Sequence, residues 1–312
     1  MPAVFFHLTG IQRGSLKDQL AEFAKQIGVA FYQGPSLYWS FVRKGHSAYQ
    51  CIDELCFQRN GPLVKEFERL FESLFEAAKP YIELIRTIAK YRYGIGQAEL
   101  IAKSKLPDGG NTVRRLHQLE EAGFITSLVP YGRKDKGLYY VMDDEYSLFY
   151  LYWIEPKLKV ISRKSINQGF WLAQANQPAW KTWAALSFES TCYKHIDQIR
   201  KALKIDPGAS SGTWRFVPKA NEQEDGAQID LLFDRLDGAI TLCEIKYSDK
   251  PFAIDKSYAQ EILKKMEVFK KQTKTKKQLF FSMITTMGLK PTMYSEELIS
   301  NEAILDDLFK KI

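Results

Sequence analysis

The sequence predicts an α/β protein of the mixed α+β kind, with a helical front part, a small helix-and-hairpin segment and a C-terminal α/β domain. Apolar residues recur at three- and four-residue spacing up to about residue 122, two strand-like runs follow, and strands alternate with helices after residue 181. The 312 residues favour two domains. A composition of 45% apolar and 26% charged residues excludes disordered, collagenous and disulfide-framework chains.

Residues 1–78 are predicted to be mostly helical. Ser15 is a plausible N-cap for a helix over residues 15–24, with Asp18 completing a partial capping box. Further along, helical spacing predicts a buried stripe formed by Leu63, Phe67, Leu70, Phe71 and Leu74. Lys79-Pro80 is expected to end this helical run, which places a domain boundary at residue 78.

Residues 79–155 predict a winged helix-turn-helix. Helices are expected over 81–89, 97–103 and 111–122, with a turn over 105–110 and Gly123 as the C-terminal cap of the third helix. Strands are expected over 124–129 and 137–142, and the loop between them is polar and basic. Three helices followed by a basic hairpin are the order of a winged helix.

The third of these helices is the candidate recognition helix, because arginine and glutamine can reach base edges and a helix N-terminus can approach a phosphate. Duplex DNA is therefore the predicted partner, and the alternative is a protein–protein module with a solvated basic face. The predicted DNA-binding residues are Asn111, Thr112, Arg114, Arg115 and Gln118 on the helix, and Arg133, Lys134 and Lys136 on the wing.

Residues 156–180 are predicted to be a connector, and residues 181–312 an α/β domain. In that domain we expect a helix over 182–203, strands over 213–217, 228–234 and 239–247, a lysine-rich helix over 257–272 and a strand over 278–285. Lysines in and after the last helix either solvate its surface or follow phosphates; they are Lys264, Lys265, Lys270, Lys271, Lys274, Lys276 and Lys277.

The strongest candidate for catalysis lies on a predicted hairpin. The Asp237-Gly238 step between two apolar runs indicates a tight turn, so Asp230 on the first strand comes near Glu244 on the second. Glu244 and Lys246 are two residues apart and share one face of their strand. Two carboxylates suit Mg²⁺, which prefers oxygen ligands, and the lysine can orient a nucleophile or stabilise an anionic transition state. The alternative is a Glu-x-Lys pair on a solvated strand.

Asp230, the spacing to Glu244, and Glu244-x-Lys246 resemble the PD-(D/E)xK nuclease superfamily, although Ile229 stands where the pattern has proline. The resemblance implies catalytic roles for Asp230, Glu244 and Lys246, and a metal site formed by Asp230, Glu244 and an upstream acidic residue, Glu189. Magnesium is the implied cofactor and a DNA endonuclease the implied activity.

Residues 36–312 also resemble the C-terminal part of a bacterial and archaeal AAA-type ATPase family, which joins an ATPase module to a winged helix and a PD-(D/E)xK-like domain. The stretches that carry this resemblance are 66–75, 119–125, 146–150, 188–189, 226–232 and 243–246. It implies that residues 1–78 are a helical remnant of the ATPase module. The alternative function is then a non-catalytic DNA-binding or regulatory protein, and a homo-oligomer or an ATPase partner is expected.

ATP binding is not expected, because the sequence has no Gly-x-x-x-x-Gly-Lys-Ser/Thr loop to hold phosphates. The acidic run Ile52-Asp53-Glu54 lies in a helical stretch, so it does not replace the missing acidic strand. Four cysteines without zinc-ligand spacing predict free thiols in a reducing compartment. With no secretory signal and no apolar run of membrane-spanning length, the chain is expected to be cytoplasmic without a membrane partner.

Overall fold

A mixed α/β fold is observed in the computed structural model, which describes residues 43, 45–91, 94–107, 109–128, 131–132, 138–163, 166–167, 169–175, 177–218 and 225–312. The helix predicted over 15–24 lies outside the described residues. By their internal contacts the residues divide into two units. Unit 1 comprises residues 1–128 and 137–187, and unit 2 comprises residues 129–136 and 188–312.

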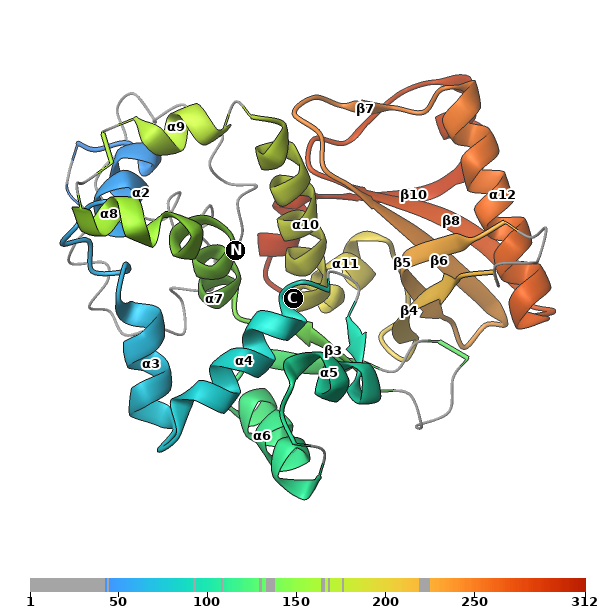
Figure 1. The fold of residues 1–312 in the computed structure, drawn as a ribbon. Helices are drawn as coiled ribbons and strands as arrows, with labels where there is room; N and C mark the ends of the chain where they lie inside the picture. Colours follow the sequence, from blue (N-terminus) through green and yellow to red (C-terminus); the bar gives the residue numbers. More distant parts are fainter. Residues whose placement is uncertain are drawn as a thin grey trace. The chain divides into compact units, whose positions relative to one another are not determined.

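Unit 1 is mainly helical (Figure 1). Its middle part has the predicted order of three helices and a hairpin, and the hairpin forms a three-stranded sheet with a short strand that the sequence did not indicate, in the order β1-β3-β2. The elements are α2 (Ala48–Cys56), α3 (Glu66–Leu74), α4 (Ala78–Ile88), β1 (Ile95–Gly96), α5 (Gln97–Ser104), α6 (Gly110–Glu121), β2 (Ile125–Leu128), β3 (Tyr139–Met142), α7 (Glu145–Phe149), the π-helical turn η4 (Tyr150–Ile154), the 3₁₀ turn η5 (Glu155–Lys157), α8 (Leu158–Arg163), α9 (Phe170–Ala175) and α10 (Pro178–Lys194), whose last turns belong to unit 2.

Three expectations for unit 1 need correction. The predicted stripe is buried at Leu63, Phe67 and Phe71, but Leu74 at the end of α3 is 52% exposed. Pro80 does not separate two helices; it lies in the first turn of α4, where a backbone N–H has no intrahelical partner to lose. The connector over 156–180 is itself largely helical. Gly123, with φ of 75°, follows α6 in the left-handed conformation expected of a C-terminal cap.

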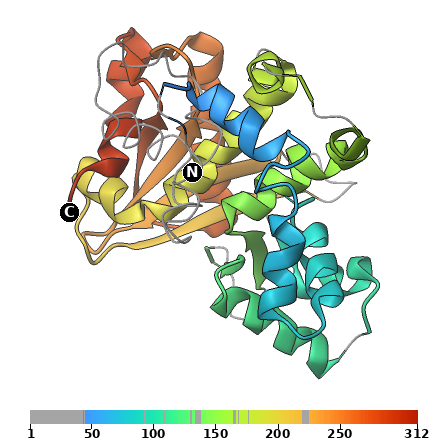
Figure 2. The same cartoon turned by 90° about the vertical axis from the view of Figure 1, so that its left-hand side faces the viewer.

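The helices of unit 1 are held by aromatic packing and by a few buried polar contacts. The rings of Phe67 and Tyr150 stack at 4.4 Å, which joins α3 to η4. Helices α5 and α6 both pack against α4, in the cyan and green part of Figure 2. The buried Asp53 of α2 accepts hydrogen bonds from the backbone N–H groups of Gly169 and Trp171 at the start of α9. Asp53 therefore has a structural role in a helix, as the sequence predicted for the 52–54 run.

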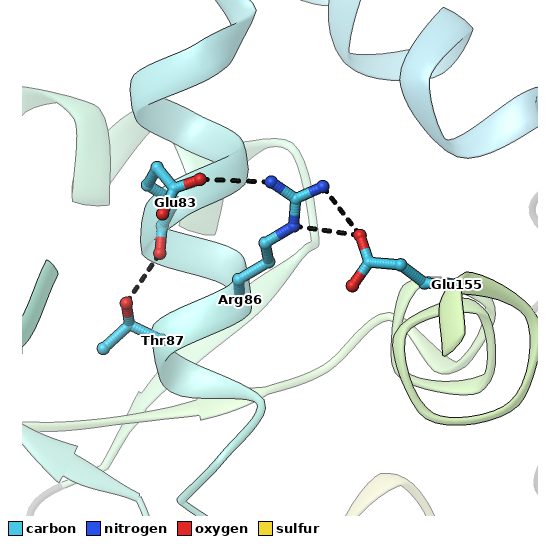
Figure 3. A network of polar contacts seen from close by, with 4 residues as sticks. All are labelled: Glu83, Arg86, Thr87 and Glu155. Carbon is cyan, nitrogen blue, oxygen red and sulfur yellow. Dashed lines mark hydrogen bonds and ion pairs between the residues drawn. The ribbon is translucent and has the colours of Figure 1, made fainter. Parts of the chain in front are cut away.

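Arg86 ties α4 to the segment around η5 (Figure 3). Its guanidinium donates to one carboxylate oxygen of Glu155 through Nε at 3.0 Å and through Nη2 at 2.6 Å, and to Glu83 through Nη1 at 3.1 Å. The hydroxyl of Thr87 donates to the backbone carbonyl of Glu83. These contacts fix the orientation of α4, on which α5 and α6 pack.

Unit 2 is a five-stranded mixed sheet with the order β10-β8-β6-β5-β4, in which β6, β8 and β10 are parallel and β4, β5 and β6 alternate in direction. The elements after α10 are α11 (Ile196–Ala202), β4 (Ser210–Phe216), β5 (Ala227–Asp234), β6 (Ala239–Lys246), β7 (Phe252–Ala253), α12 (Lys256–Thr273), β8 (Gln278–Thr285), β9 (Leu289–Lys290), α13 (Met293–Leu298), β10 (Ile299–Ile304) and the 3₁₀ turn η6 (Leu305–Phe309). The helix predicted over 182–203 is thus two helices, separated at His195, and α13 and β10 were not predicted.

The core of unit 2 lies between the sheet and α12 (Figure 1). Ile262 and Phe269 of α12 belong to one hydrophobic cluster with Leu242 of β6 and Phe281 of β8. The predicted hairpin is present, with Gly238 at a φ of 81° in the turn between β5 and β6.

All four cysteines are buried free thiols, as the sequence predicted. Among the residues placed by the structure, no helix is both long and apolar enough to cross a membrane.

Candidate functional site

The hairpin of β5 and β6 sets the positions of the candidate catalytic residues. The two strands pair antiparallel, and their paired register ends at Leu231 opposite Cys243. Asp230 and Glu244 are the next residues beyond this register on the two strands. The turn at Gly238 therefore brings them to neighbouring positions, and the charge of Asp230 acts on the pKa of Glu244. The proximity predicted from strand spacing is therefore present in the fold.

The side chain of Asp230 connects β5 to β6 just beyond the last paired residues of the two strands. Its Oδ2 accepts a hydrogen bond from the backbone N–H of Ile245 at 3.0 Å, and its Oδ1 accepts one from the side-chain amide of Gln228 at 3.0 Å. Burial, and secondly the negative charge of Glu189, raise the pKa of Asp230 to about 6. The carboxylate is therefore placed firmly but is short of compensating positive charge.

Glu244 is buried and bound by two side chains of α12. The ammonium of Lys265 lies 2.7 Å from Oε1 and 2.6 Å from Oε2, and the hydroxyl of Tyr258 donates to Oε1 at 3.2 Å. Burial, and next the charge of Asp230, still raise the pKa of Glu244 despite the lysine. The effect of Asp230 on this pKa shows that the two carboxylates act on each other.

Lys246 lies on the same face of β6 as Glu244, which confirms the two-residue periodicity predicted for the pair. Its ammonium is 5.1 Å from the ring centroid of Tyr258 and 5.6 Å from that of Phe252, at cation–π distance. Tyr258 therefore contacts both residues of the Glu-x-Lys pair. Lys246 contacts aromatic rings, whereas Lys265 forms the ion pair with Glu244.

Glu189 reaches the same site from α10. Its Oε1 accepts a hydrogen bond from the buried hydroxyl of Tyr193 at 3.1 Å, and the same hydroxyl lies 2.9 Å from the backbone carbonyl oxygen of Asp230. The charge of Glu189 is one cause of the raised pKa of Asp230. The structure thus brings Glu189, Asp230 and Glu244 from three elements into one electrostatic neighbourhood.

The carboxylates offer the oxygen donors that Mg²⁺ prefers, and their buried negative charge favours a cation. With the side chains as they lie, however, no three histidine, cysteine, aspartate or glutamate side chains within the described ranges are grouped to hold a metal ion. The Lys265 ammonium takes the place beside both Glu244 oxygens where a cation would bind. The donor types match the preference of a hard cation, and in this structure one of the two central carboxylates is paired with Lys265.

Sequence reasoning missed Lys265, Tyr258 and Tyr193 as members of the site. Lys265 could have been found, because it lies three residues after Ile262 and four before Phe269, within the apolar stripe of α12. The lysine cluster is also less available to phosphates than its composition indicates. Lys264 pairs with Asp225 at 2.9 Å and Lys277 pairs with Asp234.

The residues predicted on the recognition helix divide into exposed and anchored side chains of α6. Asn111 and Arg114 are exposed. Arg115 and Gln118 are half-buried against Tyr81 of α4: the Arg115 guanidinium lies 5.9 Å from the ring centroid, and Gln118 accepts a hydrogen bond from the hydroxyl at 2.6 Å. Only part of the predicted surface is therefore presented to solvent.

Contrary to the prediction, Thr112 does not lie on the exposed face of α6, because its side chain is fully buried. Its hydroxyl donates to the backbone carbonyl of Pro107 at 2.8 Å and closes the turn before α6. The first turn of α6 starts at Gly109 without a side-chain cap. A cavity of about 300 Å³ lies at this end of the helix, lined in part by Pro80, Asn111 and Arg115.

The predicted wing residues Arg133, Lys134 and Lys136 lie outside the described residues. Tyr131, which precedes them in the same loop, belongs to unit 2. Its backbone N–H donates to the carbonyl of Thr213 at 2.8 Å, its hydroxyl donates to Asp234 at 3.1 Å, and its ring stacks on Phe269. Burial, and next the charge of Asp234, raise the pKa of Tyr131 to about 12. Tyr131 is thus part of the packing of unit 2.

Comparison with models of protein families gives no match, and neither do comparisons with curated proteins and with solved structures.

Proposed function

We propose that unit 2 carries a divalent-cation-dependent phosphodiesterase site that cleaves DNA. The observation that carries this proposal is the neighbouring pair of carboxylates, Asp230 and Glu244, with Lys246 on the same strand face as Glu244. Glu189 adds a third carboxylate from α10. The resemblance of this hairpin to the PD-(D/E)xK pattern agrees with the same activity.

Asp230 and Glu244 would hold the cation, with Glu189 as a further acidic group beside Asp230. When bound, Mg²⁺ stabilises negative charge on a phosphodiester and lowers the pKa of a coordinated water. Positive charge at this place would also relieve the repulsion that raises the pKa values of Asp230 and Glu244.

The other side chains have separate tasks. The backbone N–H of Ile245 and the amide of Gln228 orient Asp230. The rings of Tyr258 and Phe252 hold the ammonium of Lys246 near the carboxylates, where it can orient a nucleophile or stabilise an anionic phosphate. A lysine held on ring faces keeps its charge available, since those faces do not neutralise it as a carboxylate would.

Unit 1 is proposed to bind duplex DNA through α6, in the manner of a winged helix. The support is the order of three helices and a hairpin, the exposed Arg114 and Asn111, and the uncapped first turn of α6. Backbone N–H groups at such an end favour phosphate oxygens. Binding is expected to depend mainly on phosphate contacts, and therefore on salt.

A second candidate is a non-catalytic DNA-binding protein, resembling a remnant of an AAA-type ATPase without ATP hydrolysis. The observation that favours it is the ion pair between Lys265 and Glu244, which occupies one of the two central carboxylates. In this alternative the ion pair between Lys265 and Glu244 has only a structural role in the unit.

A plasmid-nicking assay separates the two candidates. The full chain is incubated with supercoiled DNA and Mg²⁺, with EDTA as the metal-free control. Nicking is expected with Mg²⁺ and should be lost in Glu244→Gln and Lys246→Met, while Glu267→Gln, at an exposed position of α12, keeps it. Equal nicking by the Glu244→Gln variant and the parent would remove the proposed site from the reaction. No nicking by any folded form would favour the non-catalytic alternative.

A further inference from the structure

Lys265 stands out because a charged side chain occupies the buried face of α12. Ile262 and Phe269, three residues before it and four after it, are both in the core of unit 2. The side chain of Lys265 is only 25% exposed. Burial of an ammonium is unfavourable unless a partner compensates its charge, so a specific contact must hold the lysine there.

That contact is with both carboxylate oxygens of Glu244, at 2.7 Å and 2.6 Å. Tyr258 lies about two turns before Lys265 on the same helix, and its hydroxyl donates a hydrogen bond to the same carboxylate. The neighbouring Lys264 has a 54% exposed side chain and pairs with Asp225 at the surface. The two adjacent lysines of α12 therefore have different surroundings, and only Lys265 enters the site.

Lys246, the lysine of the Glu-x-Lys pair, does not pair with Glu244 as Lys265 does. Lys246 lies over the rings of Tyr258 and Phe252, so its charge remains available. The ammonium of Lys265, in contrast, is paired with both carboxylate oxygens of Glu244. A divalent cation at Glu244 would be repelled by an ammonium that remained at hydrogen-bond distance from both oxygens.

We propose that Lys265 controls cation binding at this site. It holds the Glu244 carboxylate while no divalent cation is present, and it must leave Glu244 when a cation binds, so the ion pair weakens the apparent cation affinity. This inference rests on the proposed function, because it takes Asp230 and Glu244 to be the cation ligands. Lys265 is accordingly a positioning residue that acts through Glu244.

The test measures Mn²⁺ binding to the full chain by isothermal titration calorimetry at pH 8. Lys265→Met keeps the length of the side chain and removes the competing charge, so it should bind Mn²⁺ at least about tenfold more tightly than the parent, since a hydrogen-bonded ion pair no longer has to break. The matched control is Lys264→Met, which makes the same change one residue away and should leave the affinity unchanged. Lys265→Arg keeps the charge and should bind no more tightly than the parent.

Thermal unfolding gives a second readout that does not depend on activity. Lys265→Met should unfold at a lower temperature than the parent in EDTA, because Glu244 loses its partner, and Mn²⁺ should raise its unfolding temperature by more than that of the parent. If Lys265→Met does not fold, Lys265→Gln, which can still donate one hydrogen bond, replaces it in both measurements.

The outcomes distinguish this inference from its premise. Equal or weaker Mn²⁺ binding by Lys265→Met, or by Lys265→Gln where it replaces Lys265→Met, would overturn the role of Lys265 and leave the cation site standing, provided that the parent binds Mn²⁺ and Glu244→Gln does not. No Mn²⁺ binding by the parent or by any folded variant would overturn both the inference and the proposed cation-dependent function.

Discussion

Replacement of Asp230 by asparagine is expected to stabilise unit 2 at neutral pH. The carboxylate is buried, and its pKa is raised to about 6, first by burial and then by the charge of Glu189. Asparagine has nearly the same shape and keeps an oxygen that can accept the hydrogen bond from the backbone N–H of Ile245. The substitution therefore removes a poorly compensated charge without creating a cavity.

The magnitude follows from the pKa shift. A rise from 3.8 to about 6 means that, between these values, the folded state binds more protons at Asp230 than the unfolded state does. The contribution of this group to stability therefore decreases as the pH rises through that window. Each pKa unit corresponds to about 1.4 kcal/mol, so ionised Asp230 lowers the free energy of unfolding by at most about 3 kcal/mol at pH 7.

The assay is differential scanning calorimetry of the full chain and of Asp230→Asn between pH 5 and pH 8, without divalent cations. The transition of unit 2 should move to higher temperature in the variant, and the difference should shrink as the pH falls toward 5. Asp255→Asn is the control with the opposite sign, because hydrogen bonds from the Tyr258 N–H and the Ser257 hydroxyl lower the pKa of Asp255. Its native carboxylate stabilises the protein over the whole range from pH 5 to pH 8, because that effect is lost only below the ordinary pKa of 3.8, so the effect of Asp255→Asn should not change with pH in this range.

A lower unfolding temperature for Asp230→Asn at pH 7 would refute this reasoning, and so would a difference of the same size at pH 5 and pH 8. A stabilising replacement of a site carboxylate is the pattern of a group retained for function at the expense of stability. Added Mn²⁺ should stabilise the parent but not the variant, if Asp230 is a cation ligand.

Three further predictions concern unit 1. Thr112→Val should lower the free energy of unfolding by about 0.5–1.5 kcal/mol in urea titrations, because the buried Thr112 side chain loses its hydrogen bond to the carbonyl of Pro107; no change would mean that this hydrogen bond does not hold the turn. Asp53→Ala should lower it by about 3 kcal/mol or more, since the N–H groups of Gly169 and Trp171 lose their acceptor, and a variant as stable as the parent would contradict that role. Arg114→Glu should weaken binding to duplex DNA and reduce the log–log salt slope by roughly 0.9 or more, with Arg163→Glu on α8 as the control, and an unchanged slope would exclude a phosphate contact by Arg114.

Much of the local structure could be predicted from the sequence. Helical spacing located α5, α6 and α12 to within a residue or two, and short apolar runs located β5, β6 and β8. The Asp237-Gly238 turn fixed the register, and with it the neighbouring positions of Asp230 and Glu244. These features depend on residues close together in the chain, which is why their periodicity is visible without a structure.

Where the sequence reasoning was incomplete, features that the apolar pattern does not reveal decided the outcome. Thr112 fits an exposed position by composition, but the turn at Pro107 buries its hydroxyl. Pro80 reads as a helix end, yet α4 accommodates it in the first turn. The end of the chain, with α13 and β10, lacks a strong period of its own, and β10 is defined by its parallel pairing with β8.

The sequence by itself determined the mixed α/β class, the hairpin that carries Asp230, Glu244 and Lys246, and the identity of the candidate ligands, because strand alternation and turn chemistry are local properties. Only the tertiary structure decided which basic side chain forms an ion pair with Glu244. Lys265 is 21 positions further along the chain, and α12 folds back over the sheet to bring its ammonium to the carboxylate. The raised pKa of Asp230 likewise comes from burial and from Glu189 on another helix. Desolvation and charge proximity depend on how the chain packs, and neither can be derived from spacing along it.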